Sequence, residues 1–163
     1  MEDILKTKLG ENGELSPKLC QEFGLTEYDP SNYIELETLG KGSFGIVKRC
    51  KFIPKYEFHA VKKVTMQGIP RDKMLDNISS YLVEYEVFSK KLNQIQHPNI
   101  AAFKGGHFIS NASNNTIESL VLITEAGDFS LLELLKCRQK ERKTEPPYSQ
   151  EEALSILLAI VEP

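Results

Sequence analysis

Three closely spaced glycines limit what this chain can fold into more than any other feature. The segment LGKGSFGIVKRC carries Gly40, Gly42 and Gly45 in the spacing G-x-G-x-x-G. Glycine lets a loop backbone approach a phosphate group closely, because a Cβ atom would hold the two apart. The spacing alone is weak evidence, since it occurs both at strand-to-helix turns that bind dinucleotides and in hairpins that cover nucleotide phosphates.

The residues after Gly45 help to distinguish these two structures. A dinucleotide-binding oxidoreductase, one alternative, requires a helix directly after Gly45. Residues 46–53 (IVKRCKFI) are instead rich in β-branched and aromatic side chains and are followed by Pro54, which is typical of a strand. A further strand-like run, residues 58–64, contains Lys62. The sequence therefore predicts a glycine hairpin between two strands, followed by a strand that carries a lysine.

The same residues resemble the eukaryotic protein kinase family. The three glycines and Val47 meet the family pattern G-x-G-x-x-G-x-V, and Ala60-Val61-Lys62 is similar to the end of its V-A-I-K motif. His59 departs from that motif. Two later segments add to the resemblance, which covers residues 33–163: His97-Pro98-Asn99-Ile100 and Leu120-Val121-Leu122-Ile123-Thr124-Glu125.

The resemblance implies an α+β fold. We expect a protein-kinase-like N-lobe, made of a five-stranded antiparallel sheet plus one long helix, followed by the first helices of a truncated C-lobe. Residues 1–32 are expected to form an N-terminal extension, ordered only in part, because glycines and prolines interrupt it. The partial kinase domain at 33–163 would divide into an N-lobe (33–125), a hinge (126–129) and the start of a C-lobe (130–163).

Local patterns predict the individual elements. The long helix should lie between Pro70 and Pro98, where apolar residues recur at steps of three and four. This stretch is longer than in the family, so either the helix is extended or its exit loop is enlarged. A capping box at residues 149–152 predicts the start of a last helix. The other expected elements are strands at 33–39, 46–53, 58–64, 101–109 and 119–125 and a helix at 130–143.

Two lysines compete for the role of phosphate ligand that the resemblance implies. Side chains alternate along a strand, so Ala60 and Lys62 share one face and Lys63 lies on the other. In the family a small alanine lies beside the purine two residues before the lysine, which favours Lys62 and predicts that Lys63 faces outward. The resemblance also implies a helix glutamate as partner of Lys62. Glu84 and Glu86 both qualify by position.

The helix itself favours Glu84, because the residue four positions later should be apolar and pack into the core. Phe88 follows Glu84 at that distance, whereas Lys90 follows Glu86. At the hinge, the resemblance places Thr124 at the mouth of the purine pocket. It gives the catalytic pair as Lys62 and Glu84, and the ATP-binding residues as Leu39, Gly40, Lys41, Gly42, Ser43, Phe44, Gly45, Val47, Ala60, Lys62, Lys63, Thr124, Glu125 and Gly127.

The chain lacks the other half of the family's catalytic residues. It contains no His-Arg-Asp and no Asp-Phe-Gly; Asp128-Phe129-Ser130 follows the expected hinge strand and lacks the glycine. We therefore expect no metal site in this chain, with Mg²⁺ ligands in a missing C-lobe of the same protein, and no phosphotransfer by residues 1–163 alone. The expected function is that of an ATP-binding piece of a protein kinase that phosphorylates a hydroxyl, Ser or Thr by family frequency, of a protein substrate. The alternative is a pseudokinase-like module that binds a nucleotide or a partner.

Bulk composition excludes several other classes. A net charge of −3 and a pI of about 5.7 argue against a nucleic-acid partner. The longest apolar stretch, residues 153–161, is too short to span a bilayer, so no membrane partner is expected. Cys20, Cys50 and Cys137 are widely spaced and odd in number, which predicts reduced thiols and a cytoplasmic or otherwise intracellular protein.

Overall fold

The computed structural model describes residues 15–42, 45–95, 97–113, 115–141 and 146–161. These residues form an α+β structure with a six-stranded mixed sheet and four α-helices.

Two compact units make up the chain. The first, Met1–Gln96 with Ala102–Ala126, contains the sheet and is called the sheet unit below. The second, His97–Ala101 with Gly127–Pro163, is called the helical unit.

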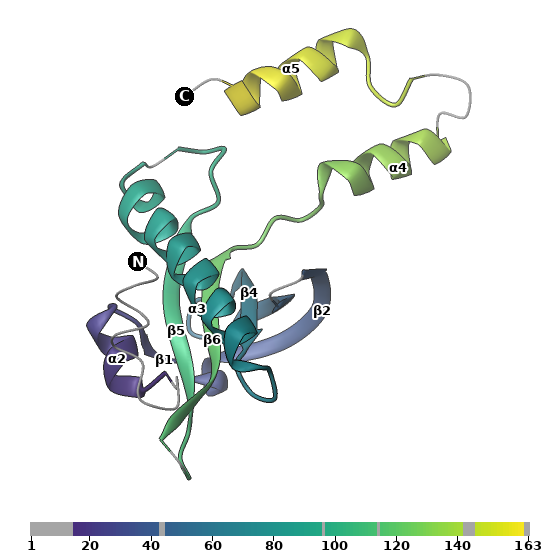
Figure 1. Ribbon diagram of the computed structural model, residues 1–163. Helices are drawn as coiled ribbons and strands as arrows, with labels where there is room; N and C mark the ends of the chain where they lie inside the picture. The colour runs from purple at the N-terminus through teal and green to yellow at the C-terminus, as the bar shows by residue number, and fades with distance from the viewer. Residues whose placement is uncertain (1–14, 43–44, 96, 114, 142–145, 162–163) are drawn as a thin grey trace. The chain divides into compact units, whose positions relative to one another are not determined.

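The sheet has the strand order β1-β5-β6-β4-β3-β2 (Figure 1). All pairs among strands β2 to β6 are antiparallel, whereas β1 pairs with β5 in the parallel direction. The expected sheet of five antiparallel strands is therefore wrong in its strand count, because β1 comes from the segment expected to lie outside the fold. The strands are β1 (Thr26–Glu27), β2 (Tyr33–Gly42), β3 (Gly45–Phe52), β4 (Glu57–Thr65), β5 (Phe103–Asn111) and β6 (Thr116–Glu125).

The long helix α3 (Arg71–Glu86) begins one residue after Pro70 and lies along the sheet (Figure 1). It continues through a π-helical turn, η2 (Val87–Lys91), and a 3₁₀ turn, η3 (Leu92–Gln94). The extra residues before His97 thus extend the helical segment. A π turn accommodates an added residue by widening one turn of the helix.

Within the segment expected to be an N-terminal extension, residues 15–28 contribute side chains to the buried clusters of the sheet unit. Ser16 caps helix α2 (Pro17–Glu22) by accepting a hydrogen bond from the Leu19 N–H at 3.3 Å, and Pro17 occupies the first turn. A short 3₁₀ turn, η1 (Pro30–Asn32), leads into β2. Five apolar side chains of this segment are almost completely buried: Leu15, Leu19, Cys20, Leu25 and Tyr28.

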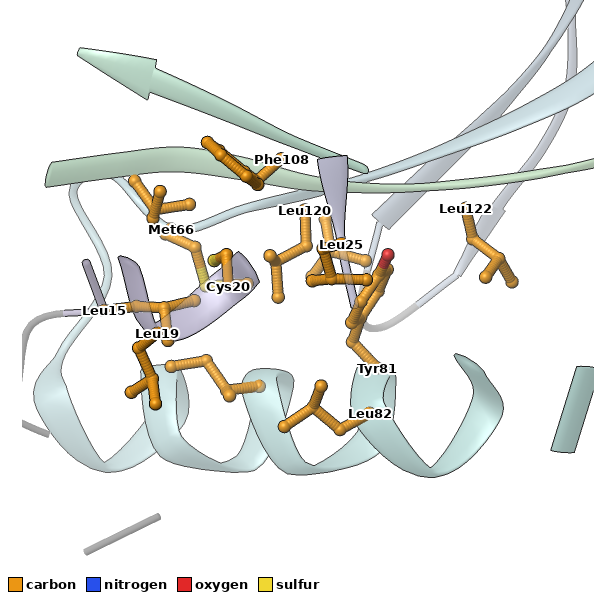
Figure 2. Packing of buried hydrophobic residues seen from close by; sticks show 13 residues of the cluster. Leu15, Leu19, Cys20, Leu25, Met66, Tyr81, Leu82, Phe108, Leu120 and Leu122 are labelled. Carbon is orange, nitrogen blue, oxygen red and sulfur yellow. The ribbon is translucent and has the colours of Figure 1, made fainter. Parts of the chain in front are cut away.

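The main core lies between α3 and one face of the sheet. Figure 2 shows side chains of α2 and of the following residues in the space between α3 and the strands. Tyr81 of α3 is 1% exposed, and its hydroxyl donates a hydrogen bond to the Val121 carbonyl at 2.8 Å. A smaller buried cluster contains Tyr28, Cys50, Val61, Val121 and Ile123.

The helical unit contains α4 (Leu131–Glu141) and α5 (Gln150–Val161). The predicted capping box at Ser149 is confirmed, because Ser149 N–H donates to Glu152 at 2.9 Å and Glu152 N–H donates to Ser149 Oγ at 3.1 Å. Arg138 joins the two helices through an ion pair with Glu152 at 2.7 Å. Among the described residues, no helix is long and apolar enough to cross a membrane.

His107 of β5 should make stability depend on pH. Burial lowers the pKa of His107 below its ordinary value of 6.5, and its Nδ1 atom lies 2.8 Å from Thr26 Oγ1. The unfolded state therefore takes up a proton first as pH falls through 6.5, so the free energy of unfolding decreases there and levels off below the folded pKa. Urea unfolding at about pH 8 and about pH 5.5 measures this loss.

The control for this prediction is His107→Gln, which keeps a polar side chain and cannot titrate in that range. Its free energy of unfolding should fall less between the two pH values than that of the wild type. An equal decrease in both proteins would show that His107 does not cause the pH dependence.

Candidate functional site

Strand register brings several of the predicted residues into one row across the sheet. Gly40 of β2 lies opposite Val47 of β3, Val47 lies opposite Lys62 of β4, and Lys62 lies opposite Leu122 of β6. Directly opposed residues point to the same face of a sheet. Since Leu122 is part of the main core under α3, the Lys62 side chain lies on the face that α3 covers.

Lys62 and Glu84 form an ion pair between β4 and α3. Lys62 Nζ lies 2.5 Å from Glu84 Oε2, and the two side chains are 26% and 33% exposed. Glu86 instead pairs with Lys90 at 3.2 Å. The structure thus brings together Lys62 and the glutamate that the position of Phe88 favoured.

Residues beside Glu84 hold this part of α3 in place. Tyr85 donates a hydrogen bond from its hydroxyl to the Gly24 carbonyl at 3.2 Å. Phe88 packs against the main core and stacks with Phe103 at a centroid distance of 6.2 Å. The Lys62–Glu84 pair therefore lies at the edge of a packed core, where the helix position is fixed on two sides.

A second row lies next to the first. Arg49 of β3 lies opposite Ala60 of β4, and Ala60 lies opposite Thr124 of β6. Ala60 and Thr124 are partly buried and share the face of Lys62. The Arg49 guanidinium lies 4.5 Å from the centre of the Phe58 ring.

Arg49 was absent from the residues predicted from sequence. The motifs used for the prediction do not include this position, and the strand register places Arg49 opposite Ala60. A strand alternation counted from Val47 would have found it, because Arg49 lies two residues later.

Lys63 points away from this row, as the alternation along β4 predicted. Its ammonium group lies 2.7 Å from Glu35 Oε1 and 5.4 Å from the centre of the Tyr28 ring, on the opposite face of the sheet. His59, the departure from the lysine motif, also lies on that face, where it is 4% exposed and stacks with Phe52. That departure therefore leaves the face of Lys62 unchanged.

The three glycines of the hairpin differ in their surroundings. A Cβ atom at Gly45 would lie 2.3 Å from the Lys63 carbonyl oxygen, so Gly45 is required by the close approach of β3 and β4. Among the described residues, a Cβ atom at Gly40 would meet nothing within 4 Å, and one at Gly42 would lie 4.0 Å from the nearest atom. None of the three has a φ angle in the left-handed region.

The remaining predicted residues are placed as follows. Leu39 and Lys41 are exposed on β2, and Ser43 and Phe44 lie outside the described residues. The Glu125 N–H donates to the Ala102 carbonyl at 2.8 Å. Gly127 belongs to the helical unit and is exposed.

Among the described residues, no group of three or more His, Cys, Asp or Glu side chains is arranged so that it could hold a metal ion.

No protein-family model matches this chain, and no curated protein matches it either.

The strand after Gly45 excludes one alternative. A dinucleotide-binding turn needs a helix at that point, whereas Gly45–Phe52 is β3. The row across the sheet instead combines the Lys62 ammonium group, the glycine backbone of the hairpin and the apolar side chain of Val47. This combination suits a ligand that carries phosphate groups and a flat ring.

Proposed function

We propose that the sheet unit binds ATP as a protein-kinase-like N-lobe, in which Lys62 contacts the α- and β-phosphates. The helical unit would be the start of a C-lobe, with residues 126–129 as the hinge. The observation that supports this most is the 2.5 Å ion pair between Lys62 and Glu84. An ammonium group that must stay charged near a low-dielectric core needs such a partner, and the pair also fixes the lysine rotamer.

The glycines support the same proposal. Gly45 has a packing reason to be glycine, but Gly40 and Gly42 have neither a neighbouring atom nor a left-handed φ angle that requires it. A ligand phosphate that approaches the hairpin backbone would explain why positions 40 and 42 are glycines. Val47 and Ala60 would provide the apolar surface against the purine, because both share the face of Lys62.

The proposed reaction is transfer of the ATP γ-phosphate to a hydroxyl of a protein substrate in the complete kinase. ATP would supply the transferred group, and this chain would bind and position it. Because His-Arg-Asp and Asp-Phe-Gly are absent from the sequence, residues 1–163 alone should show no measurable transfer with Mg²⁺ and a protein substrate. The second candidate is a pseudokinase-like module that binds a nucleotide or a partner and regulates another protein.

An acyl phosphate of ATP tests the nucleotide site, because it detects weak binding. A lysine amine next to the phosphates attacks the acyl carbonyl and forms an amide, and ATP leaves. Peptide mapping of residues 1–163 should find the label on Lys62, and excess ATP should suppress it.

Matched lysine variants control this experiment. Lys62→Met should abolish the ATP-protected label, whereas Lys63→Met should leave it unchanged because Lys63 lies on the other face of β4. Equal labelling of both lysines without protection by ATP would contradict the proposal.

A further inference from the structure

A cavity of about 500 Å³ lies in the sheet unit apart from the Lys62–Glu84 pair. We call it the far-face cavity. Neither Lys62 nor Glu84 lines it. Its lining residues are Glu35, Gly45, Ile46, Lys48, Val61, Lys63, Thr65, Ile69 and Asn77.

The register of β3 and β4 places much of this lining on one face. Lys48 lies opposite Val61, and Ile46 lies opposite Lys63. These four residues alternate with Val47 and Lys62 along their strands, so their side chains lie on the other face of the sheet. The charged residues of the far-face cavity therefore lie on the other side of β3 from Val47 and of β4 from Lys62, although the cavity shares Gly45 with the glycine hairpin and Asn77 comes from α3.

Three charged side chains of the cavity form one connected group. Glu35 pairs with Lys63 at 2.7 Å through Oε1 and with Lys48 through Oε2. Hydrogen bonds from Lys48 and Lys63 lower the pKa of the Glu35 carboxyl, and the bond to Glu35 raises the pKa of Lys48. With two lysines and one glutamate, the group has a formal net charge of one positive unit.

These charges are combined with apolar walls. An ammonium group has three N–H donors, and the bond to Glu35 takes one from each lysine. Ile46, Val61 and Ile69 supply apolar surface, while Thr65 and Asn77 add neutral hydrogen-bonding groups. Ligand sites typically have about 300–1,000 Å³ and mainly apolar linings with a few polar groups that fix the ligand.

We propose that the far-face cavity binds a small organic carboxylate with an apolar body. One net positive charge matches a monoanion. A phosphate monoester carries nearly two negative charges at neutral pH, and the neighbouring Glu35 carboxylate would repel it. The occupant contacts β3 and β4, the two strands that carry Val47 and Lys62 on their other face.

The probe for this site is 4-phenylbutyrate, with uncharged 4-phenylbutanamide as its matched control. Each is titrated into residues 1–163 and followed by amide chemical shifts. We expect saturable shifts at the lining residues with the carboxylate, and binding about two- to fivefold weaker with the amide, because an exposed ion pair contributes modestly. Absence of saturable shifts, or equal affinity for both probes, would overturn the proposal.

Four variants test which charges are responsible. Lys48→Met and Lys63→Met should each weaken binding of the carboxylate by about two- to fivefold. Glu35→Gln should strengthen it by a similar factor, since the net charge of the group rises. Lys51→Met, a lysine of β3 whose ammonium group lies over the Tyr56 ring instead, should bind as the wild type does.

The lysine variants should weaken binding of the carboxylate, whereas Glu35→Gln should strengthen it. Misfolding cannot produce this result, because it would weaken binding in every variant. Weaker binding by Glu35→Gln, or an equal loss in Lys51→Met and Lys63→Met, would contradict the assigned site. Because the probe contains no nucleotide, the outcome is independent of ATP binding at Lys62.

Discussion

Leu25→Ala is expected to lower the free energy of unfolding of the sheet unit by about 2–5 kcal/mol, the usual cost of truncating a buried leucine. Leu25 is 2% exposed and belongs to the main core with Ile78, Tyr81 and Leu82 of α3. The site is tightly packed, because a Cβ atom built at Gly106 would lie 2.9 Å from Leu25 Cδ2. Urea unfolding followed by circular dichroism measures the change.

Val83→Ala is the matched control for Leu25→Ala. Val83 lies in α3 but is 51% exposed, so its truncation should change the free energy of unfolding by less than about 0.5 kcal/mol. If Leu25→Ala were as mild as Val83→Ala, residues 15–28 would not be part of the cooperative core.

This N-terminal segment is the part of the fold that the sequence predicted least well. Its helix α2 has six residues and its strand β1 has two, so neither contains enough residues for a hydrophobic period. Strand β1 exists because Thr26 pairs with His107 of β5, a residue far away along the chain. Local patterns contain no information on such a pairing.

The segments with strong local patterns were predicted well. Strands β2 to β6 and α3 all lie where alternation or helical spacing indicated them, with ends displaced by a few residues. The same helical spacing extends to Tyr81, which lies three residues after Ile78. Tyr81 is 1% exposed and its hydroxyl donates to a backbone carbonyl, so the core of α3 includes a polar group as well as apolar ones.

The placement of Lys62 and Lys63 on opposite faces followed from strand alternation alone. The contact of Lys62 with Glu84 rather than Glu86 followed from the apolar residue four positions later on the helix. The far-face cavity could not be predicted in this way, because Glu35, Lys48 and Lys63 come from three strands whose register only tertiary structure determines.

Gly45→Ala should destabilise the protein and Gly40→Ala should not, although both residues lie in one hairpin. At Gly45 the added Cβ would lie 2.3 Å from the Lys63 carbonyl oxygen and 3.4 Å from Val64 Cα. Both atoms belong to the backbone, so β3 must move away from β4. We expect a loss of about 1–3 kcal/mol in the free energy of unfolding, as for other overpacked sites.

Gly40→Ala should leave stability within about 0.5 kcal/mol of the wild type. Its added Cβ would meet no atom within 4 Å, and its φ angle is one that alanine adopts. If nucleotide phosphates occupy that space, the same methyl group should hold them away and reduce the ATP-protected labelling of Lys62. Urea unfolding and peptide mapping of the labelled protein give both quantities for each variant.

Stability and labelling together show whether the fold or a bound ligand requires glycine at position 40. A stable Gly40→Ala protein that loses the ATP-protected label would mean that a bound group, and not the fold, requires glycine at that position. Full labelling of Gly40→Ala would contradict a phosphate contact at Gly40. An unfolded Gly40→Ala protein would contradict the open surroundings of Gly40 themselves, on which the argument for a phosphate at this hairpin depends.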